Sequence, residues 1–355
     1  MHYSNLNDTD TAVLVGVNVT EAELDELAAL CSTCNIQAVG RVVQNRKDVD
    51  VTYYVGKGKV DEIKQLVEDT GATCVVFDVE LSGSKVRNLE QVLNVPVLDR
   101  SKVILDIFAA RAQSMEGKMQ VELAQLKYNS TRLVASGAGL AQMKNAVGMR
   151  GPGEKKLELD KRTIRDQITA LEDKLKKVAA NRDLTRRGSA KSGKMRVCIV
   201  GYTNSGKSTL LNTIAKAGVV AEDKLFATLD PKTANIYIHK DDGTGVQVLL
   251  TDTVGFIDKL PHEFIRAFES TLDEARLADL LLHVVDISNP EHKKQVDVVN
   301  EVLKKIHAQD VPVIMVYNKT DMNQTFKTND KNAVVISAKA NTGIDDLKRK
   351  ILKFV

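Results

Sequence analysis

One eight-residue segment, Gly201 to Ser208, constrains this 355-residue chain more than any other. It reads Gly-Tyr-Thr-Asn-Ser-Gly-Lys-Ser, matches the pattern G-x-x-x-x-G-K-[ST], and directly follows the apolar run Met195–Val200. In a loop of this kind, glycines let backbone N–H groups face a pyrophosphate, Lys207 reaches the β- and γ-phosphates, and the Ser208 hydroxyl binds Mg²⁺. We therefore expect a strand-loop-helix unit that binds a nucleoside triphosphate with magnesium.

A second motif, Asn318-Lys319-Thr320-Asp321, follows the predicted strand Val311–Tyr317 and indicates the base. The Asp321 carboxylate can accept hydrogen bonds from N1–H and N2–H₂ of guanine, whereas adenine has an acceptor at N1 and would leave this carboxylate unpaired. We expect Asn318 to tie the loop to the phosphate loop and the Lys319 stem to lie along the base plane. The sequence therefore predicts guanine specificity.

A third loop supports the same base. The tripeptide Ser337-Ala338-Lys339 follows the predicted strand Ala333–Ile336. A Ras-like domain places a backbone N–H on guanine O6 at this point. The tripeptide is a weak signal alone, but its position after the base motif favours a nucleotide contact.

Two further segments are expected to sense the γ-phosphate. Asp252-Thr253-Val254-Gly255 follows the predicted strand Val246–Thr251. Asp252 would hold magnesium through a water, and the Gly255 N–H would reach the γ-phosphate only when that phosphate is present. The other segment, Phe226-Ala227-Thr228-Leu229-Asp230, precedes the predicted strand Thr233–His239, and Thr228 would complete the magnesium shell in the triphosphate state.

These motifs define the predicted site. The predicted GTP-binding residues are Gly201, Tyr202, Thr203, Asn204, Ser205, Gly206, Lys207, Ser208, Thr209, Phe226, Ala227, Thr228, Leu229, Asp230, Asp252, Thr253, Val254, Gly255, Asn318, Lys319, Thr320, Asp321, Ser337, Ala338 and Lys339. The predicted magnesium ligands are Ser208, Thr228 and, through water, Asp252. Lys207, Thr228 and Gly255 are the predicted catalytic groups.

Intrinsic hydrolysis is expected to be slow. Many guanine-nucleotide hydrolases carry a water-positioning glutamine after the second-switch glycine, but this chain has Phe256, which cannot form a hydrogen bond to water. Asn204 matches a position that several glutamine-lacking relatives use to hold a monovalent cation, such as K⁺, near the β/γ bridge. The alternative is a polar residue tolerated at a variable loop position.

The residues before this domain are predicted to form two further units. Residues 11–98 alternate β-rich and helical runs, which predicts a small α/β layer. Apolar residues then recur at heptad spacing in two stretches, which predicts an antiparallel helical hairpin with a long flexible Gly-rich tip from Ser136 to Lys156. The predicted domains are an N-terminal α/β domain (1–112), the hairpin (113–190) and a C-terminal P-loop, Ras-like G domain (191–355).

Basic charge is concentrated around the predicted tip. Residues 141–196 contain 16 Lys and Arg against 7 Asp and Glu, although the whole chain has a net charge of only +3. A solvated helix face is the ordinary meaning of such a run, but its position at a Gly-rich tip favours a polyanion surface. Arg150, Lys155 and Lys156 are the candidate RNA-binding residues.

The remaining features exclude several classes of protein. The chain has no run of eighteen apolar residues, and its start lacks the basic and apolar regions of a secretory signal, so we expect a cytoplasmic protein without a membrane span. Cys31 and Cys34 form one Cys-x-x-Cys, but no second pair or His cluster completes a zinc site. The four cysteines are therefore interpreted as reduced core residues, with a redox or metal role as the alternative.

Several segments outside the nucleotide motifs resemble one family. Gln120–Tyr128 (QVELAQLKY), Arg150–Glu154 (RGPGE) and Phe226–Asp230 (FATLD) are similar to the HflX family of ribosome-associated GTPases, and the resemblance covers nearly the whole chain. It implies an N-terminal domain and helical linker that dock on the large ribosomal subunit near the peptidyl-transferase region. It also implies GTP hydrolysis stimulated by that subunit, with magnesium at Ser208 and Thr228.

Two departures from the family pattern bear on this expectation. Lys155-Lys156 and Asp160-Lys161-Arg162 replace the Thr-Gln and Asp-Arg-Arg of many members. The extra C-terminal domain of longer members is not expected after Val355.

The expected function is that of a monomeric protein that binds GTP and GDP, hydrolyses GTP and contacts large-subunit rRNA. Its role would lie in ribosome splitting and rescue or in control of subunit association. One alternative is a hibernation-type ribosome-binding module whose nucleotide turnover is incidental, and another is a GTPase that acts on tRNA or a protein partner.

Overall fold

The computed structural model describes residues 10–142, 152–190, 194–215, 225–226, 229–240, 243–261, 264 and 269–354, without the side chains of 133–142, 152–157, 182–190 and 269–271. The chain divides into two compact units, which we describe separately. One unit comprises Met1–Ala110 with Met119–Lys174, and the other Arg111–Lys118 with Leu175–Val355. Within the described part of the chain, every helix is too short or too polar to span a bilayer.

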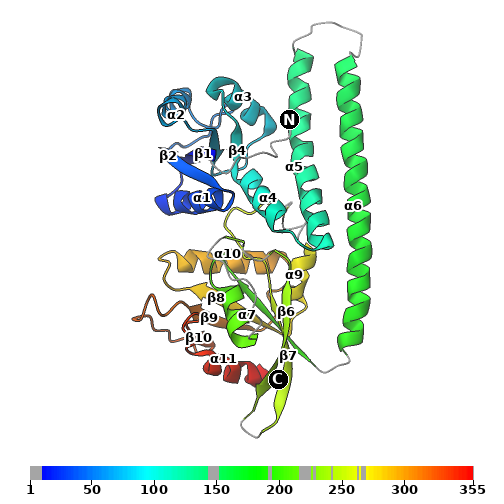
Figure 1. Ribbon diagram of the computed structural model, residues 1–355. Coiled ribbons are helices and arrows are strands. Elements are labelled where there is room, and N and C mark those ends of the chain that lie inside the picture. The colour runs from blue at the N-terminus through cyan, green and yellow to red at the C-terminus, as the bar shows by residue number, and fades with distance from the viewer. Residues whose placement is uncertain are drawn as a thin grey trace. The chain divides into compact units, whose positions relative to one another are not determined.

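The N-terminal part alternates strands and helices, as predicted (Figure 1). Its elements are β1 (Asp10–Val17), α1 (Glu21–Thr33), β2 (Ile36–Gln44), α2 (Lys57–Thr70), β3 (Cys74–Phe77), α3 (Gly83–Leu93), β4 (Val97–Asp99) and α4 (Arg100–Arg111). The four strands form a parallel sheet in the order β2-β1-β3-β4. Its strands are rich in Val, and β3 is buried along its whole length, as expected for a parallel sheet covered on both faces.

Two long helices follow, α5 (Met115–Gln142) and α6 (Pro152–Ala190), and they run side by side in Figure 1. An ion pair of 2.8 Å between Lys127 Nζ and Glu172 Oε1 joins them, and Leu171 is buried. This arrangement confirms the predicted α/β fold with a helical linker.

The predicted long tip from Ser136 to Lys156 was wrong in extent, because helix continues through residues 136–142 and resumes at Pro152. The alanines at 135, 138 and 141 favour helix despite the nearby glycines, and proline is well tolerated at a first helical position, where its missing N–H is not needed.

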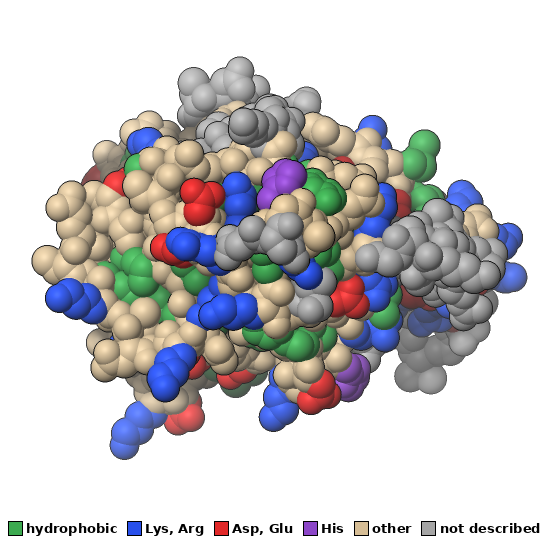
Figure 2. Space-filling model, turned by 90° about the horizontal axis from the view of Figure 1, so that it is seen from below, with side chains coloured by type: hydrophobic (Ala, Val, Ile, Leu, Met, Phe, Trp, Pro, Cys, Tyr) green, Lys and Arg blue, Asp and Glu red, His purple; other side chains and the backbone are tan. Residues whose placement is uncertain are grey.

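The predicted basic surface stays a prediction. Arg150 lies outside the described residues, and Lys155 and Lys156 lie at the start of α6, where side chains are not described. The face of the molecule shown in Figure 2 carries Lys and Arg side chains dispersed over it, with Asp and Glu among them. Among the described side chains visible on that face, Lys and Arg do not gather into a single patch.

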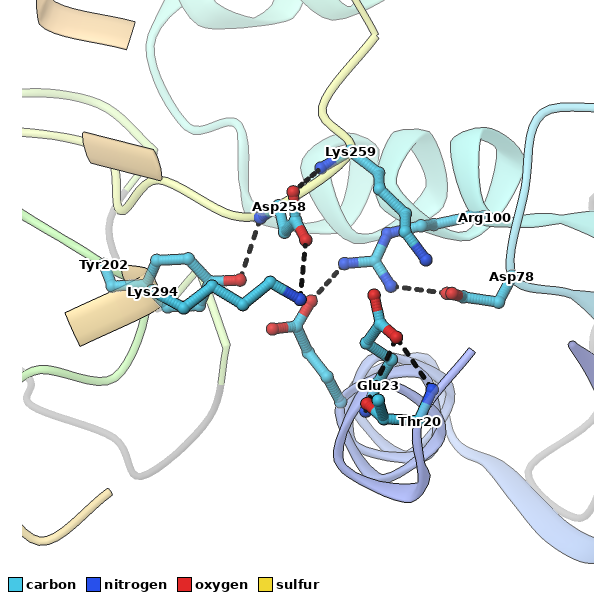
Figure 3. A network of polar contacts seen from close by, with 9 residues as sticks. Thr20, Glu23, Asp78, Arg100, Tyr202, Asp258, Lys259 and Lys294 are labelled. Atoms are coloured by element: carbon cyan, nitrogen blue, oxygen red, sulfur yellow. Dashed lines mark hydrogen bonds and ion pairs between the residues drawn. The ribbon is translucent and has the colours of Figure 1, made fainter. Parts of the chain in front are cut away.

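Buried charged side chains hold the carboxyl edge of the N-terminal sheet. Arg100 is 2% exposed and donates to Asp78 Oδ1 at 2.7 Å (Figure 3). It also pairs with Glu26. Burial opposes the charge of this guanidinium, but the two carboxylates outweigh that effect and raise the pKa of Arg100. The pair joins β3 to the start of α4.

A second carboxylate, Asp99, connects the same sheet edge to α5. It is fully buried, and its oxygens accept hydrogen bonds from Tyr128 Oη at 2.8 Å and from the backbone N–H of Leu81 at 3.0 Å. Arg132 pairs with the same carboxylate, and its guanidinium carbon lies 3.5 Å from the centroid of the Tyr128 ring. One buried acid therefore anchors the middle of α5.

The cysteines are unpaired thiols in the structure, three of them buried. Burial raises the pKa of Cys34 to about 12 and that of Cys74 to about 12. Among the described residues, no cluster of His, Cys, Asp and Glu has the arrangement of a metal site.

The C-terminal unit contains a sheet of mixed direction. Its elements are β5 (Met195–Gly201), α7 (Lys207–Ala215), β6 (Lys232–His239), β7 (Gly245–Asp252), α9 (Glu269–Arg276), β8 (Leu280–Asp286), α10 (His292–Lys305), β9 (Val313–Asn318), β10 (Ala333–Val335), α11 (Ile344–Ile351) and a 3₁₀ turn (Leu352–Phe354). The strand order is β10-β9-β8-β5-β7-β6, with only β6 antiparallel to its neighbour.

Helices cover both faces of this sheet. Apolar residues of α7 and α11 form one core with alternate residues of the strands, such as Leu282 and Val284 of β8. The intervening residues Leu281 and Val285 are also buried, because α10 packs against the other face. In the sheet, β5 lies between β7 and β8, and the connections on its two sides run in opposite directions. The carboxyl end of β5 is therefore a topological switch point, where α/β proteins bind ligands.

Removing the Asp99 carboxylate tests the anchor of α5. We expect Asp99→Ala to lower the free energy of unfolding by about 3 kcal/mol, since Arg132 and Tyr128 lose their buried acceptor. Urea unfolding followed by circular dichroism measures this. Asp48→Ala, at an exposed position, is the matched control and should change stability by less than about 0.5 kcal/mol. Equal losses in the two variants would contradict the anchoring role.

Candidate nucleotide-binding site

The predicted phosphate loop lies between β5 and α7, at the switch point of the sheet. Gly206 has φ +92, and a Cβ there would overlap the side-chain amide of Asn318, so both conformation and space require glycine. The hydroxyls of Thr203 and Ser205 are buried and have no hydrogen-bond partner among the described residues. Buried polar atoms are normally hydrogen-bonded, so these two groups are suited to a polar ligand in the loop.

Lys207 is the buried cation of the loop. It is 6% exposed, and its Nζ donates to the backbone oxygen of Tyr202 at 2.6 Å. Burial lowers the pKa of Lys207 to about 8, although the charge of Asp252 opposes that effect. A phosphate oxygen beside Nζ would add negative charge and favour the charged form of the lysine.

Ser208 and Asp252, two of the predicted magnesium ligands, are in direct contact. The Ser208 hydroxyl donates to Asp252 Oδ2 at 2.6 Å, which joins the start of α7 to the end of β7. Hydroxyl and carboxylate oxygens are the hard ligands that Mg²⁺ prefers, so the residues present fit a magnesium ion.

The segment from Asp252 to Phe256, which we call the second switch, is hydrogen-bonded to the phosphate loop. Phe256 N donates to Gly201 O at 3.1 Å, and Thr203 N donates to Phe256 O at 2.7 Å. The Phe256 ring is 1% exposed. The side chain after Gly255 is therefore buried and apolar, and it cannot orient an attacking water.

Side chains extend the same contact. The backbone N–H of Asp258 donates to the Tyr202 hydroxyl at 2.8 Å, and Lys294 of α10 lies 3.5 Å from Asp258 Oδ2 (Figure 3). The Thr253 hydroxyl, fully buried, donates to Ile199 O at 2.8 Å and so holds the segment to β5. Thr253 acts on the backbone of β5 in this arrangement.

Asn318 joins the three predicted nucleotide loops. Its Nδ2 donates to Ser205 O at 2.9 Å, which is the predicted tie to the phosphate loop, and its Oδ1 accepts from Ala338 N at 2.9 Å. Asp321, an exposed residue, accepts a 2.6 Å hydrogen bond from the Ser337 hydroxyl. The base motif and the Ser337-Ala338-Lys339 loop therefore form one structure.

The segment from Phe226 to Asp230, which we call the first switch, is described only in part, since Ala227 and Thr228 lie outside the described residues. Phe226 and Leu229 on either side are each 2% exposed. The Asp230 carboxylate accepts hydrogen bonds from Gln113 N at 2.9 Å and Ser114 N at 2.8 Å, in the segment that leads into α5. The predicted magnesium contact of Thr228 stays a prediction.

The other predicted residues lie around the same loops. Asn204, at φ +59, is an exposed residue of the phosphate loop. Val254 is buried, while Lys339 is exposed. Thr209 lies in the first turn of α7, and Thr320 N donates to Ile336 O at 3.3 Å.

Two residues at the site were not predicted. Asp286, the last residue of β8, pairs with Lys319 Nζ at 2.8 Å. Thr213 of α7 donates to Ala338 O at 2.9 Å. Asp286 could have been predicted from the sequence, because it ends an apolar strand and the carboxyl ends of parallel strands form the ligand edge of the sheet. Thr213, one of several polar residues on a helix, had none.

Buried His283 lies beside this site. Burial, together with the nearby charge of Lys207, lowers the pKa of His283 to about 4. The imidazole is therefore neutral at physiological pH, and its Nδ1 has no hydrogen-bond partner among the described residues.

Three family profiles match successive parts of the chain. A profile described as GTP-binding GTPase N-terminal matches residues 21–109, and one described as GTP-binding GTPase Middle Region matches 111–188. A third, described as 50S ribosome-binding GTPase, matches residues 196–319. Together they match most of residues 21–319.

Relatives in several bacteria match most of the chain. It is 45% identical over 347 residues to the GTPase HflX of Caldanaerobacter subterraneus, covering 97% of this chain and 80% of that protein. It is 47% identical to GTPase HflX of Lacrimispora saccharolytica, covering 95% and 81%. GTPase HflX of Escherichia coli is 42% identical, with coverage of 95% and 81%.

A solved structure supports the same fold. The crystal structure of a GTP-binding protein from Sulfolobus solfataricus in complex with GDP aligns with a TM-score of 0.50 and 25% identity, covering 97% of this chain and 98% of that one. With phosphate-loop and guanine motifs at one sheet edge, and with HflX relatives above 40% identity over nearly the whole length, this chain belongs to the HflX family of GTPases.

Proposed function

We propose that this GTPase binds GTP and GDP at the carboxyl edge of the β5 sheet and attaches to the large ribosomal subunit according to the nucleotide bound. The observation that carries the nucleotide part is the junction at Asn318, which brings the phosphate loop and both base loops together. The match of residues 196–319 to a 50S ribosome-binding GTPase profile supports the partner.

The residues have separate tasks in this proposal. The Lys207 ammonium meets the β- and γ-phosphate oxygens, while Asp321 accepts the guanine N1–H and N2–H₂. Ser208 and Thr228, with Asp252 through water, would hold Mg²⁺. Magnesium, when bound, neutralises charge that develops on the phosphate oxygens.

Basal turnover should be low, because the Phe256 ring is buried and no side chain at that position orients water. When basal turnover is low, a partner that orders the first switch can complete the site and raise the rate of GTP hydrolysis. The large subunit is the partner that the family points to, and ribosome splitting with rescue or control of subunit association is the role we propose.

Base selection is tested with Asp321→Asn. The asparagine amide can donate to the O2 that xanthine carries in place of the guanine amino group, so xanthosine triphosphate should bind better and GTP at least tenfold more weakly, which corresponds to about 1.4 kcal/mol. Competition binding with fluorescent nucleotides measures both affinities. The exposed Asp310→Asn is the matched control. Unchanged GTP affinity in Asp321→Asn would contradict the assignment of the base loop.

The partner is tested by turnover. GTP hydrolysis by the full chain should rise at least tenfold when purified large subunits are added, and small subunits should have little effect, because only the proposed partner orders the switches. Phosphate release under multiple turnover gives the rates. Absence of stimulation by large subunits would contradict the ribosomal role and leave tRNA or a protein as the partner.

A sucrose gradient of joined ribosomes with the protein and GTP then separates two roles. Loss of the joined peak supports splitting, whereas co-migration without splitting supports a hibernation-type binding module.

The same subunit assay tests the basic segment. Reversing Lys155 and Lys156 to glutamate should weaken subunit binding and flatten its salt dependence, since fewer counterions leave the RNA phosphates. GTP affinity is measured in parallel as the control for folding of the G domain. If the glutamate variant binds the subunit with wild-type affinity at moderate salt, these lysines belong to an ordinary solvated helix face and not to an RNA-binding surface.

The monovalent-ion hypothesis is tested by comparing salts. If Asn204 helps to hold K⁺ near the β/γ bridge, hydrolysis should be several-fold faster in potassium than in sodium at equal ionic strength, and Asn204→Ala should abolish the difference. Single-turnover rates in the two salts measure this. Equal rates in wild-type protein would remove the ion from the mechanism.

A further inference from the structure

The described end of the first switch is fixed to a helix that lies far away in sequence. Asp230 and Ser114 are 116 residues apart, yet three hydrogen bonds join the Asp230 carboxylate to this region: Oδ2 accepts from Gln113 N and Ser114 N, and Oδ1 accepts from the Ser114 hydroxyl. All of these residues belong to the same compact unit, which includes Arg111–Lys118. The contact is therefore internal to that unit.

Ser114 already caps the helix by itself. Its Oγ accepts from Gly117 N at 2.9 Å, and its backbone oxygen accepts from Lys118 N at 3.0 Å, so α5 begins in the usual way. Asp230 adds negative charge to the positive end of a 28-residue helix and satisfies the two N–H groups that precede it. The carboxylate thus fixes the chain entering α5 as well as its first turn.

The packing is close enough to constrain the sequence of α5. A Cβ at Gly117 would overlap Asp230 Oδ1, so a side chain there would displace the carboxylate. On the other side, Leu229 is 2% exposed and β6 begins at Lys232. Asp230 therefore reaches α5 only while residues 229–231 keep this conformation.

We propose that Asp230 is a positioning residue that couples the first switch to the N-terminus of α5. This inference rests on the proposed function, in which residues 226–230 respond to the γ-phosphate. A change in residues 229–231 with the nucleotide state would move the Asp230 carboxylate, and the first turn of α5 would gain or lose its acceptor. The coupling acts on the first turn of α5, a helix that continues to Gln142.

Hydrogen exchange of the full chain at saturating GDP or a non-hydrolysable GTP analogue tests the coupling. In wild-type protein, amides of Ser114–Lys118 should exchange at rates that differ between the two nucleotides. Asp230→Ala removes both acceptor oxygens, so exchange there should accelerate about fivefold and the nucleotide difference should vanish. Saturating ligand keeps nucleotide occupancy equal between variants.

Two further variants keep the test decisive. Ser114→Ala removes both the hydroxyl contact with Asp230 and the cap of Gly117 N, so exchange at Ser114–Lys118 should rise in both nucleotides, while the two backbone hydrogen bonds to Asp230 preserve a nucleotide difference. Asp310→Ala, at an exposed position of the same unit, should match wild-type protein.

The outcomes separate the coupling from the function on which it rests. If segments covering residues 225–232 respond to the nucleotide but Ser114–Lys118 do not, the coupling is wrong and the switch stands. If neither segment responds, the switch assignment itself fails. A nucleotide difference at Ser114–Lys118 that persists in Asp230→Ala would also overturn the role of Asp230.

Discussion

The two hydrogen bonds of the Asn318 side chain are the constraint on which the site depends. One amide group connects Ser205 O in the phosphate loop to Ala338 N in the last base loop, and Asn318 itself begins the loop that carries Asp321. Three segments from different strands are thus held in register by a buried residue that is 2% exposed. Loss of either bond would leave a buried polar group unpaired, so the loops hold their relative positions before any nucleotide arrives.

Around that junction the protein keeps polar groups in a buried setting. Lys207 has a backbone oxygen as its partner, and the hydroxyls of Thr203 and Ser205 are buried. Such groups lose solvation on folding, which a bound phosphate with its many oxygens can restore. The site is therefore organised for an anion at some cost to the stability of the free protein, as is usual for functional sites.

Sequence reasoning predicted the elements and motifs well, because each depends on neighbouring residues. The apolar run before Gly201 becomes β5, and the predicted tie through Asn318 is present. Contacts between segments that are distant in the sequence could not be predicted from these local patterns. Nothing in the sequence pairs Asp230 with Ser114, or Lys319 with Asp286, because these contacts follow from tertiary packing. The tip of the hairpin is shorter than its glycines indicate, because the alanines between them favour helix.

We propose above all that the bound nucleotide controls attachment to the large ribosomal subunit. Sedimentation of the full chain with purified large subunits, in the presence of a non-hydrolysable GTP analogue or GDP, tests it most directly. We expect the protein to pellet with the subunits in the analogue and to stay mostly in the supernatant in GDP, because only the triphosphate orders both switches. Equal pelleting in the two nucleotides, or none in either, would contradict the claim.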